Sequence, residues 1–264
     1  MTQLLKIEWL KLKHYRTFWV MVLLFSVLLT ALYVFVGMGV LNIGAGGMSV
    51  IGQVSSFSSL WNDLCFYASH FVIALAILMA IITTNEFQYK THRQSVIDGW
   101  TRMQFYHAHW IILLAISLVT TVFVFLLGLL CGIISGLSLS DCLDNGQKLI
   151  WLFLLTVNYL GFAMTLSFFF KRSGLTIALL MFYSMIIEFF LNLIFLFKLK
   201  SPAADMFLPL QASDDLLPLD ITKMLKNIAG ITYIPEPGAY ALATLGWIGL
   251  YYILGRIKLA KSDW

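Results

Sequence analysis

A chain of 264 residues that is 60% hydrophobic and only 11% charged, with a mean hydropathy of +0.88, cannot fold as a water-soluble globule, in which about 45–50% of residues are apolar. The composition instead indicates an all-α integral membrane protein. The net charge of +4 is explained by membrane insertion and by attraction to anionic lipid headgroups, so it does not indicate nucleic-acid binding.

Six apolar runs are long enough to cross the hydrocarbon core of a bilayer, which takes about 20 helical residues. The runs are continuous rather than alternating, and lipid offers the backbone no hydrogen-bond partner, so they are predicted to be helices. The six runs are Thr17–Leu41, Cys65–Thr84, Trp110–Leu137, Leu149–Phe170, Leu175–Phe197 and Gly238–Ile257. We expect them to form a single transmembrane domain over residues 1–264.

The basic residues predict the orientation of these helices. With the N-terminus in the cytoplasm, the inner side collects twelve of the seventeen Lys and Arg residues: Lys6, Lys11, Lys13, Arg16, Lys90, Arg93, Arg102, Lys171, Arg172, Arg256, Lys258 and Lys261. Four of the remaining five lie in one long outer segment, where the rule hardly applies. The prediction is a multi-pass protein of the plasma (inner) membrane with both termini in the cytoplasm.

The chain opens with an amphipathic pattern over residues 1–16. Leu5, Trp9 and Leu12 form one stripe, and Lys6 and Lys13 lie roughly opposite. This pattern is typical of an interfacial helix that lies flat on the membrane before the first span. The alternative is a basic tail that only sets topology.

The connection between the first and second spans, Asn42–Leu64, is rich in Gly and Ser. Such a composition predicts a mobile segment. Trp61, near its end, is expected in the aromatic belt at the membrane surface.

A polar run, Asn85–Phe105, separates the second and third spans. Ile97 follows Arg93 by four residues, and Val96 and Gly99 are three apart, so the middle of the run is predicted to form a short helix. Charges would project from one side of a helix that lies along the membrane surface, available to a soluble partner.

An acidic residue interrupts the fifth span. Glu188 is expected near mid-membrane, where a carboxylate is costly and faces a protein interior or a water-filled cavity. Asn192, one turn later, and Asn158 in the fourth span are the expected partners. The possibilities are a cation or proton contact, a polar patch along a substrate path, or a protonated acid hydrogen-bonded between helices.

All five prolines lie in the outer segment between spans five and six, residues 198–237, which is expected to be extracytoplasmic. Within it, Asp220 is predicted to cap a short amphipathic helix that contains Ile221, Met224, Leu225 and Ile228. This helix would lie at the outer leaflet or fold back partly into the membrane.

Taken together, these features resemble the permease subunit of ABC-type exporters of the ABC-2 (type V) class, over essentially the whole chain. The most specific part is residues 86–105, which in that family form a coupling helix that docks into a cleft of the ATPase subunit. The resemblance implies an ATPase-coupling role for Glu86, Phe87, Thr91, Arg93, Ile97, Gly99, Thr101 and Arg102. One departure is Lys90, because many members have Gly before the Thr.

The residue types in this run agree with that role, because a helix moved by a soluble motor must protrude and offer charges and apolar anchors. The anchors are Phe87, Tyr89, Val96, Ile97 and Trp100. The charges are Glu86, Lys90, Arg93, Asp98 and Arg102. The alternative is a basic loop that only sets topology, which needs positive charge but not interleaved aromatic residues.

The predicted function is therefore a permease that exports an amphipathic or apolar substrate. The chain has no GxxxxGK[ST] phosphate-binding loop, so we expect no cofactor on this chain and no enzymatic activity of its own, with ATP and Mg²⁺ bound by a separate cassette ATPase. Its three cysteines do not indicate a metal site. The expected partners are ATPase subunits, membrane lipids and a second six-span permease, either identical or different. The alternatives are an ATP-independent secondary transporter or channel, which Glu188 favours, and a membrane scaffold.

Overall fold

The computed structural model describes residues 9–37, 44–45, 48–49, 56–97, 99–195, 205–218 and 236–261. Within them, six helices are long and apolar enough to cross a membrane, which confirms the predicted all-α, multi-pass architecture. Five of the spans are α2 (Arg16–Gly37), α3 (Phe57–Gln88), α5 (Arg102–Ile134), α6 (Gln147–Phe170) and α11 (Pro237–Ala260). The remaining span combines α7 (Ser173–Phe182), the π-helical turn η2 (Tyr183–Ile187) and α8 (Glu188–Leu193).

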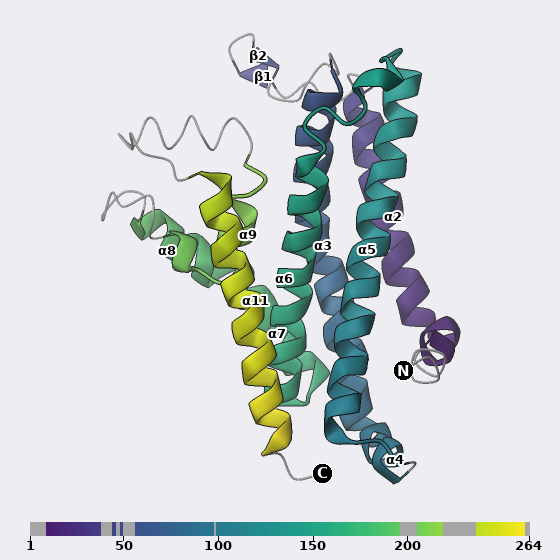
Figure 1. Cartoon of the computed structure of the whole chain (residues 1–264), viewed down its shortest axis with the longest axis vertical. Coiled ribbons are helices and arrows are strands. Elements are labelled where there is room, and N and C mark those ends of the chain that lie inside the picture. Colours follow the sequence, from purple (N-terminus) through teal and green to yellow (C-terminus); the bar gives the residue numbers. More distant parts are fainter. Residues whose placement is uncertain are drawn as a thin grey trace.

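The helix α6 is the centre of the bundle. It packs against α3, α5 and α11, while α2 packs on α3 (Figure 1). In contrast, α8 tilts away from the upright helices, and much of the α7–α8 span stays exposed. Exposed apolar side chains are expected on such a surface, because in a bilayer they face lipid tails rather than water.

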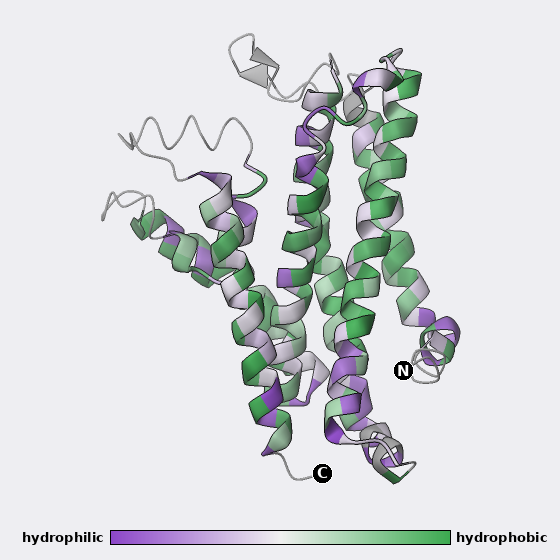
Figure 2. Ribbon diagram, in the orientation of Figure 1, coloured by the Kyte–Doolittle hydropathy of each residue, from purple (hydrophilic) through white to green (hydrophobic). Residues whose placement is uncertain are grey.

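Polar residues mark the ends of the bundle. Hydrophilic residues gather at the end that carries α4 (Thr91–Ile97), the adjoining part of α5 and a short N-terminal helix over residues 9–14, whereas the long middle parts are mostly hydrophobic (Figure 2). At the other end lie the antiparallel strands β1 (Gly44–Ala45) and β2 (Met48–Ser49), and the 3₁₀ turn η1 (Leu139–Asp141) between α5 and α6. The N-terminal helix lies inside the predicted interfacial segment 1–16.

The helix α3 begins earlier than predicted. Ser56 forms a capping box with Ser59: each side chain accepts a hydrogen bond from the backbone N–H of the other residue, which satisfies donors at the helix N-terminus. The helix therefore starts at Phe57 rather than Cys65. The prediction of a mobile connection over Asn42–Leu64 is wrong for residues 57–64.

Trp61 is also not a surface residue. It is fully buried, its ring stacks on Phe125 with centroids 5.8 Å apart, and its Nε1 donates to the backbone carbonyl of Cys142 over 2.9 Å. Gly128 of α5 faces the ring and leaves room for it. The prediction of an aromatic-belt position failed because a tertiary contact gives the indole N–H a buried partner, so the ring needs no polar interface.

Beyond the α7–α8 span, the chain turns back against the bundle. The described part, residues 205–218, contains η4 (Asp205–Phe207) and α9 (Gln211–Asp214), and we call it the re-entrant segment. It packs on α6 and α11, and α9 is seen beside α11 in Figure 1. The helix predicted after Asp220 lies outside the described residues.

The contact between Trp61 and Gly128 gives a test of this packing. A Cβ at position 128 would overlap the Trp61 ring, so Gly128→Ala is expected to lower the free energy of unfolding by about 1–3 kcal/mol through overpacking. Gly249→Ala on α11 is the control, because a Cβ there meets nothing within 4 Å. Thermal unfolding in detergent compares the two variants, and equal midpoints would contradict the packing described here.

Candidate functional site

The polar run between spans two and three folds as the short helix α4 with a tight turn on each side. The helix α3 ends at Gln88, and the N–H of Tyr89 bonds to the carbonyls of Asn85 and Phe87. Lys90 then has a φ of +56°, a left-handed conformation that glycine adopts most easily. The chain thus needs this conformation at the position where many members of the resembled family carry Gly.

A second turn leads from α4 into α5. Gly99 has a φ of +92°, as expected of a residue where the chain reverses. Thr101 then caps α5: its Oγ1 accepts from the N–H of Gln104 over 3.2 Å, and the Gln104 side chain accepts from the N–H of Thr101 over 2.8 Å. Gly99 and Thr101 therefore shape the backbone around α4.

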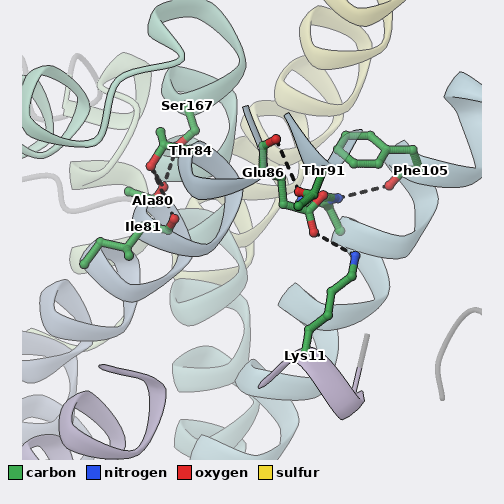
Figure 3. Close-up of polar contacts among 9 residues, drawn as sticks. Lys11, Ala80, Ile81, Thr84, Glu86, Thr91, Phe105 and Ser167 are labelled. Atoms are coloured by element: carbon green, nitrogen blue, oxygen red, sulfur yellow. Dashed lines mark hydrogen bonds and ion pairs between the residues drawn. The ribbon is translucent and has the colours of Figure 1, made fainter. Parts of the chain in front are cut away.

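The base of this turn holds a buried carboxylate, Glu86, which is only 7% exposed. Its Oε1 lies 3.0 Å from the Nζ of Lys11 in the N-terminal helix, and Thr91 Oγ1 donates to its backbone carbonyl over 3.3 Å (Figure 3). A buried carboxylate needs an opposite charge and hydrogen bonds to offset its lost hydration. Glu86 therefore ties the N-terminal helix to the end of α3.

His109 of α5 approaches the same carboxylate from the other side. Its Nδ1 lies 3.0 Å from the Phe105 carbonyl, so this nitrogen must be the donor, and its Nε2 lies 3.8 Å from Glu86 Oε2. His109 thus places its second ring nitrogen next to the buried carboxylate. Sequence reasoning did not assign His109 to this site.

A further hydrogen bond holds the chain that follows the N-terminal helix against the end of α3. Asn85 Nδ2 donates to the hydroxyl of Tyr15 over 2.7 Å, one residue before Glu86. A cleft of about 200 Å³ lies between the N-terminal helix and the end of α3 and is lined by Lys11, Tyr15 and Glu86 among others. The expected interfacial segment is thus fixed on the base of the α4 turn.

Aromatic packing joins α6 to the base. Phe87 lies edge-on to Phe105 of α5 and Phe168 of α6, with centroids 6.3 and 6.0 Å apart. One turn further into the bundle, Ser167 and Thr84 both donate to the Ala80 carbonyl, over 3.5 and 2.7 Å (Figure 3). The end of α3 is therefore held rigidly against α5 and α6.

Polar contacts connect the last two spans to the same base. Gln88 Nε2 donates to Ser173 Oγ at the start of α7 over 3.1 Å, and Arg102 Nη1 donates to the Ala260 carbonyl at the end of α11 over 3.1 Å. The described part of the polar end thus brings together the N-terminal helix and the ends of α3, α5, α6, α7 and α11. We call the contacts around Glu86 and Phe87 the root of α4.

The predicted coupling residues divide into two groups. Glu86 and Phe87 belong to the root, where their side chains contact Lys11, Phe105 and Phe168 of the chain itself; their role in ATPase coupling stays a prediction. The exposed group is Thr91, Arg93, Ile97, Gly99, Thr101 and Arg102. Within this group, the Arg102 side chain also donates a hydrogen bond to the end of α11.

The exposed group carries an apolar component. Ile97 is 77% exposed and Tyr89 is 76% exposed, and both lie at the polar end of the molecule, next to the exposed Lys90 and Arg93. We call these four residues the α4 tip. The side chains of Val96 and Asp98 lie outside the description, and Trp100 is half-buried.

The second candidate site lies around Glu188, the first residue of α8 after the π-helical turn. Its carboxylate is buried, and Oε1 accepts hydrogen bonds from the backbone N–H groups of Leu210 and Gln211 over 2.8 and 2.7 Å. These donors lie at the start of α9. Glu188 therefore caps the re-entrant segment, and this contact replaces the expected bond to a side-chain amide.

Asn158, an expected partner of Glu188, binds the same segment from α6. Its Nδ2 donates to the Pro209 carbonyl over 2.7 Å and to Ser213 Oγ over 2.9 Å. Asn158 is the twelfth of the 24 residues of α6, so the segment reaches the middle of that span. Tyr159 adds a hydrogen bond to Asp214, while Asn192 is half-buried on α8.

No metal site emerges from the described residues: no three His, Cys, Asp or Glu side chains among them are grouped so that they could hold an ion.

Comparison with known proteins adds one finding. The family model described as ABC-2 family transporter protein matches residues 4–187, more than two thirds of the chain. The match includes the root and tip of α4 and stops one residue before Glu188. The search of curated proteins gives no match.

The Lys11–Glu86 ion pair can be tested by removing one charge at a time. Lys11→Met deprives the buried carboxylate of its cation and is expected to lower the free energy of unfolding by about 1–3 kcal/mol. Adding Glu86→Gln should recover part of that loss, because the charge is then gone. Chemical unfolding in detergent measures both, with Lys13→Met, an exposed lysine of the same helix, as control. Equal effects at Lys11 and Lys13 would show that the ion pair adds no stability.

The Glu188 contact gives a second test. Glu188→Gln keeps an oxygen that accepts from Leu210 and Gln211, so we expect it to be tolerated, whereas Glu188→Leu leaves both N–H groups unsatisfied at about 1–3 kcal/mol each. Thermal unfolding and hydrogen exchange of these two amides report the loss. Asn192→Leu, also polar to apolar on α8, is the control. Unchanged exchange in Glu188→Leu would refute the capping role.

Proposed function

The chain belongs to the ABC-2 family of transporter proteins, and from this premise we propose that it is the permease subunit of an ATP-binding-cassette exporter whose ATP is hydrolysed by a separate subunit. The observation that carries the proposal is the contrast within one short segment: the α4 tip is exposed, while the root directly behind it is buried and joined to most of the bundle. Such a segment suits a device that receives force from a soluble partner.

The α4 tip has the chemistry of a docking site. Apolar side chains with large exposed fractions are costly at the polar end of a membrane protein, where water rather than lipid surrounds them. Tyr89 and Ile97 stand there beside Lys90 and Arg93. Apolar anchors within a rim of charge are the usual composition of a protein interface. A cleft with apolar pockets and acidic residues on an ATPase would complement this tip.

The root offers a route from the tip into the membrane. Thr91, the first residue of α4, bonds to the Glu86 carbonyl, and Glu86 contacts Lys11 and His109. A displacement of α4 would therefore act on the N-terminal helix and on α5 together. Coupling of this kind requires rigid elements with two arrangements, and the packed root provides the rigid part.

The remaining parts of the proposal follow from the family and from the sequence. ATP and Mg²⁺ would bind the ATPase, because the chain carries no phosphate-binding loop. Two six-span permeases would enclose the transport path in the plasma membrane. The helix α4 and both termini would lie in the cytoplasm. The exported substrate would be amphipathic or apolar, as the apolar walls of the spans suggest.

The alternative of an ATP-independent secondary transporter or channel drew its support from Glu188. Its Oε1 accepts hydrogen bonds from two backbone N–H groups of the re-entrant segment, and this contact favours a structural role for Glu188. The scaffold alternative lacks a described feature in its favour, whereas the exposed α4 tip favours the exporter.

The test is charge reversal at the tip without disturbance of the root. Arg93→Glu combined with Ile97→Asp should leave the protein inserted and folded but remove ATPase binding, since loss of a desolvated charge pair costs about 2–5 kcal/mol of association. Co-purification with the ATPase encoded nearest to this chain, followed by mass photometry, measures binding and the expected two-to-two assembly.

Arg172→Glu provides the matched control for this experiment. Arg172 is exposed in the α6–α7 connection at the same end of the molecule, so it carries the same charge change outside the tip. We expect the control to bind the ATPase with nearly unchanged affinity. Full binding and substrate-stimulated hydrolysis in the double variant at positions 93 and 97 would refute the coupling role of α4.

A further inference from the structure

An apolar groove of about 430 Å³ lies between the N-terminal helix, α2 and α5, and neither Glu86, Phe87 nor the re-entrant segment lines it. One wall comes from the N-terminal helix and the first turns of α2, with Trp9, Leu12 and Trp19. The opposite wall comes from α5, with Ala115 and Val119 among others. The volume falls within the ~300–1,000 Å³ of typical ligand pockets.

The groove results from the bend between the N-terminal helix and α2. The helix is interrupted at Tyr15, and Trp19 Nε1 donates to the Lys13 carbonyl over 2.9 Å, which fixes the corner. Farther along the chain, α2 contacts α5 through Phe25 and Phe123, whose ring centroids are 6.3 Å apart. Figure 1 shows that the N-terminal end of α2 leans away from α5. The root holds the N-terminal helix in place, so the gap persists.

The lining selects for hydrocarbon. The two hydroxyl side chains in it, Ser26 and Thr120, donate to carbonyls of their own helices, at Val22 over 2.9 Å and at Ile116 over 2.8 Å. Their hydrogens are therefore not offered to an occupant. A polar ligand would lose hydration without gaining partners, whereas an alkyl chain would bury apolar surface on both sides.

The end of the groove at the bend is positively charged. The described stretch 9–16 carries Lys11, Lys13, His14 and Arg16 and has no carboxylate. Lys11 is directed to Glu86, but Lys13 and Arg16 are exposed at the corner that Trp19 closes. Basic side chains at this level attract anionic headgroups. An apolar slot with a basic end matches the two parts of an anionic phospholipid.

We propose that this groove binds one acyl chain of an anionic phospholipid from the surrounding leaflet, with the lipid phosphate at Lys13 and Arg16. The chain fills the space between α5 and the bend, and the headgroup neutralises the exposed basic pair. The bound lipid fills the gap between the N-terminal helix and α5. This binding site does not depend on the proposed transport function.

The experiment uses the full-length protein in nanodiscs that contain equal amounts of phosphatidylglycerol and phosphatidylcholine. Native mass spectrometry after transfer to detergent counts the phospholipids that remain bound. The unaltered protein should retain phosphatidylglycerol with a preference of about fivefold or more over phosphatidylcholine, as expected for basic residues at a membrane surface. Retention of no phospholipid, or of both lipids equally, would overturn the proposal.

Variants separate the acyl chain from the headgroup. Ala115→Phe fills the groove and should abolish retention, and Val119→Trp at its exposed edge should do the same if the first variant folds poorly. Leu126→Phe, a lipid-facing change elsewhere on α5, is the control and should retain the lipid. Lys13→Gln with Arg16→Gln should bind phospholipid without preference for the anionic headgroup.

Two outcomes of the variant series would reassign the groove. Undiminished phosphatidylglycerol in both Ala115→Phe and Val119→Trp would place the bound lipid elsewhere on the protein. Dissociation of a dimer in these variants, with no lipid in the unaltered protein, would identify a second copy of the chain as the occupant. Either result would refute the lipid site and leave the ATPase-docking proposal untouched.

Discussion

A carboxylate buried at the end of a membrane helix must be neutralised by neighbours, and this requirement organises the polar end of the protein. Glu86 meets it with Lys11 from the N-terminal helix, and His109 from α5 packs on the other side of the carboxylate. Because a buried charge tolerates little displacement from its partners, these three elements are held in one arrangement. The short helix α4 begins five residues later and inherits that fixed base.

Buried polar groups also determine how the re-entrant segment packs against α6 and α8. The start of α9 presents backbone N–H groups at the depth of mid-span, where lipid would leave them unsatisfied. Glu188 and Asn158 supply the acceptor and donor that the segment needs. At Glu86 the buried carboxylate is paired with the Lys11 ammonium group, and at Glu188 it accepts two backbone hydrogen bonds.

The six spans were predictable because apolar length is a local property of the sequence. The start of α3 was not, since it depends on a Ser56–Ser59 capping box and on a pocket that buries Trp61 against α5. In the same way, the short helix α4 was predictable from local pattern, but the burial of Glu86 was not. Its cation lies 75 residues away, and no periodicity links the two positions. For Glu188, the sequence indicated a buried carboxylate, but backbone donors carry no sequence signal.

The lengths of α3 and α5 have a mechanical consequence. They contain 32 and 33 residues, and at 1.5 Å per residue each is about 48–50 Å long, beyond the ~40–45 Å of a bilayer with its headgroups. The two helices pack against each other and carry α4 at their shared end, and we call the pair the stalk. Each residue of an α-helix turns the chain by about 100° about the helix axis. The direction in which α4 points therefore depends on the number of residues in the stalk. An insertion or deletion within the stalk would therefore rotate α4 relative to the rest of the bundle, whereas a substitution there leaves its direction unchanged.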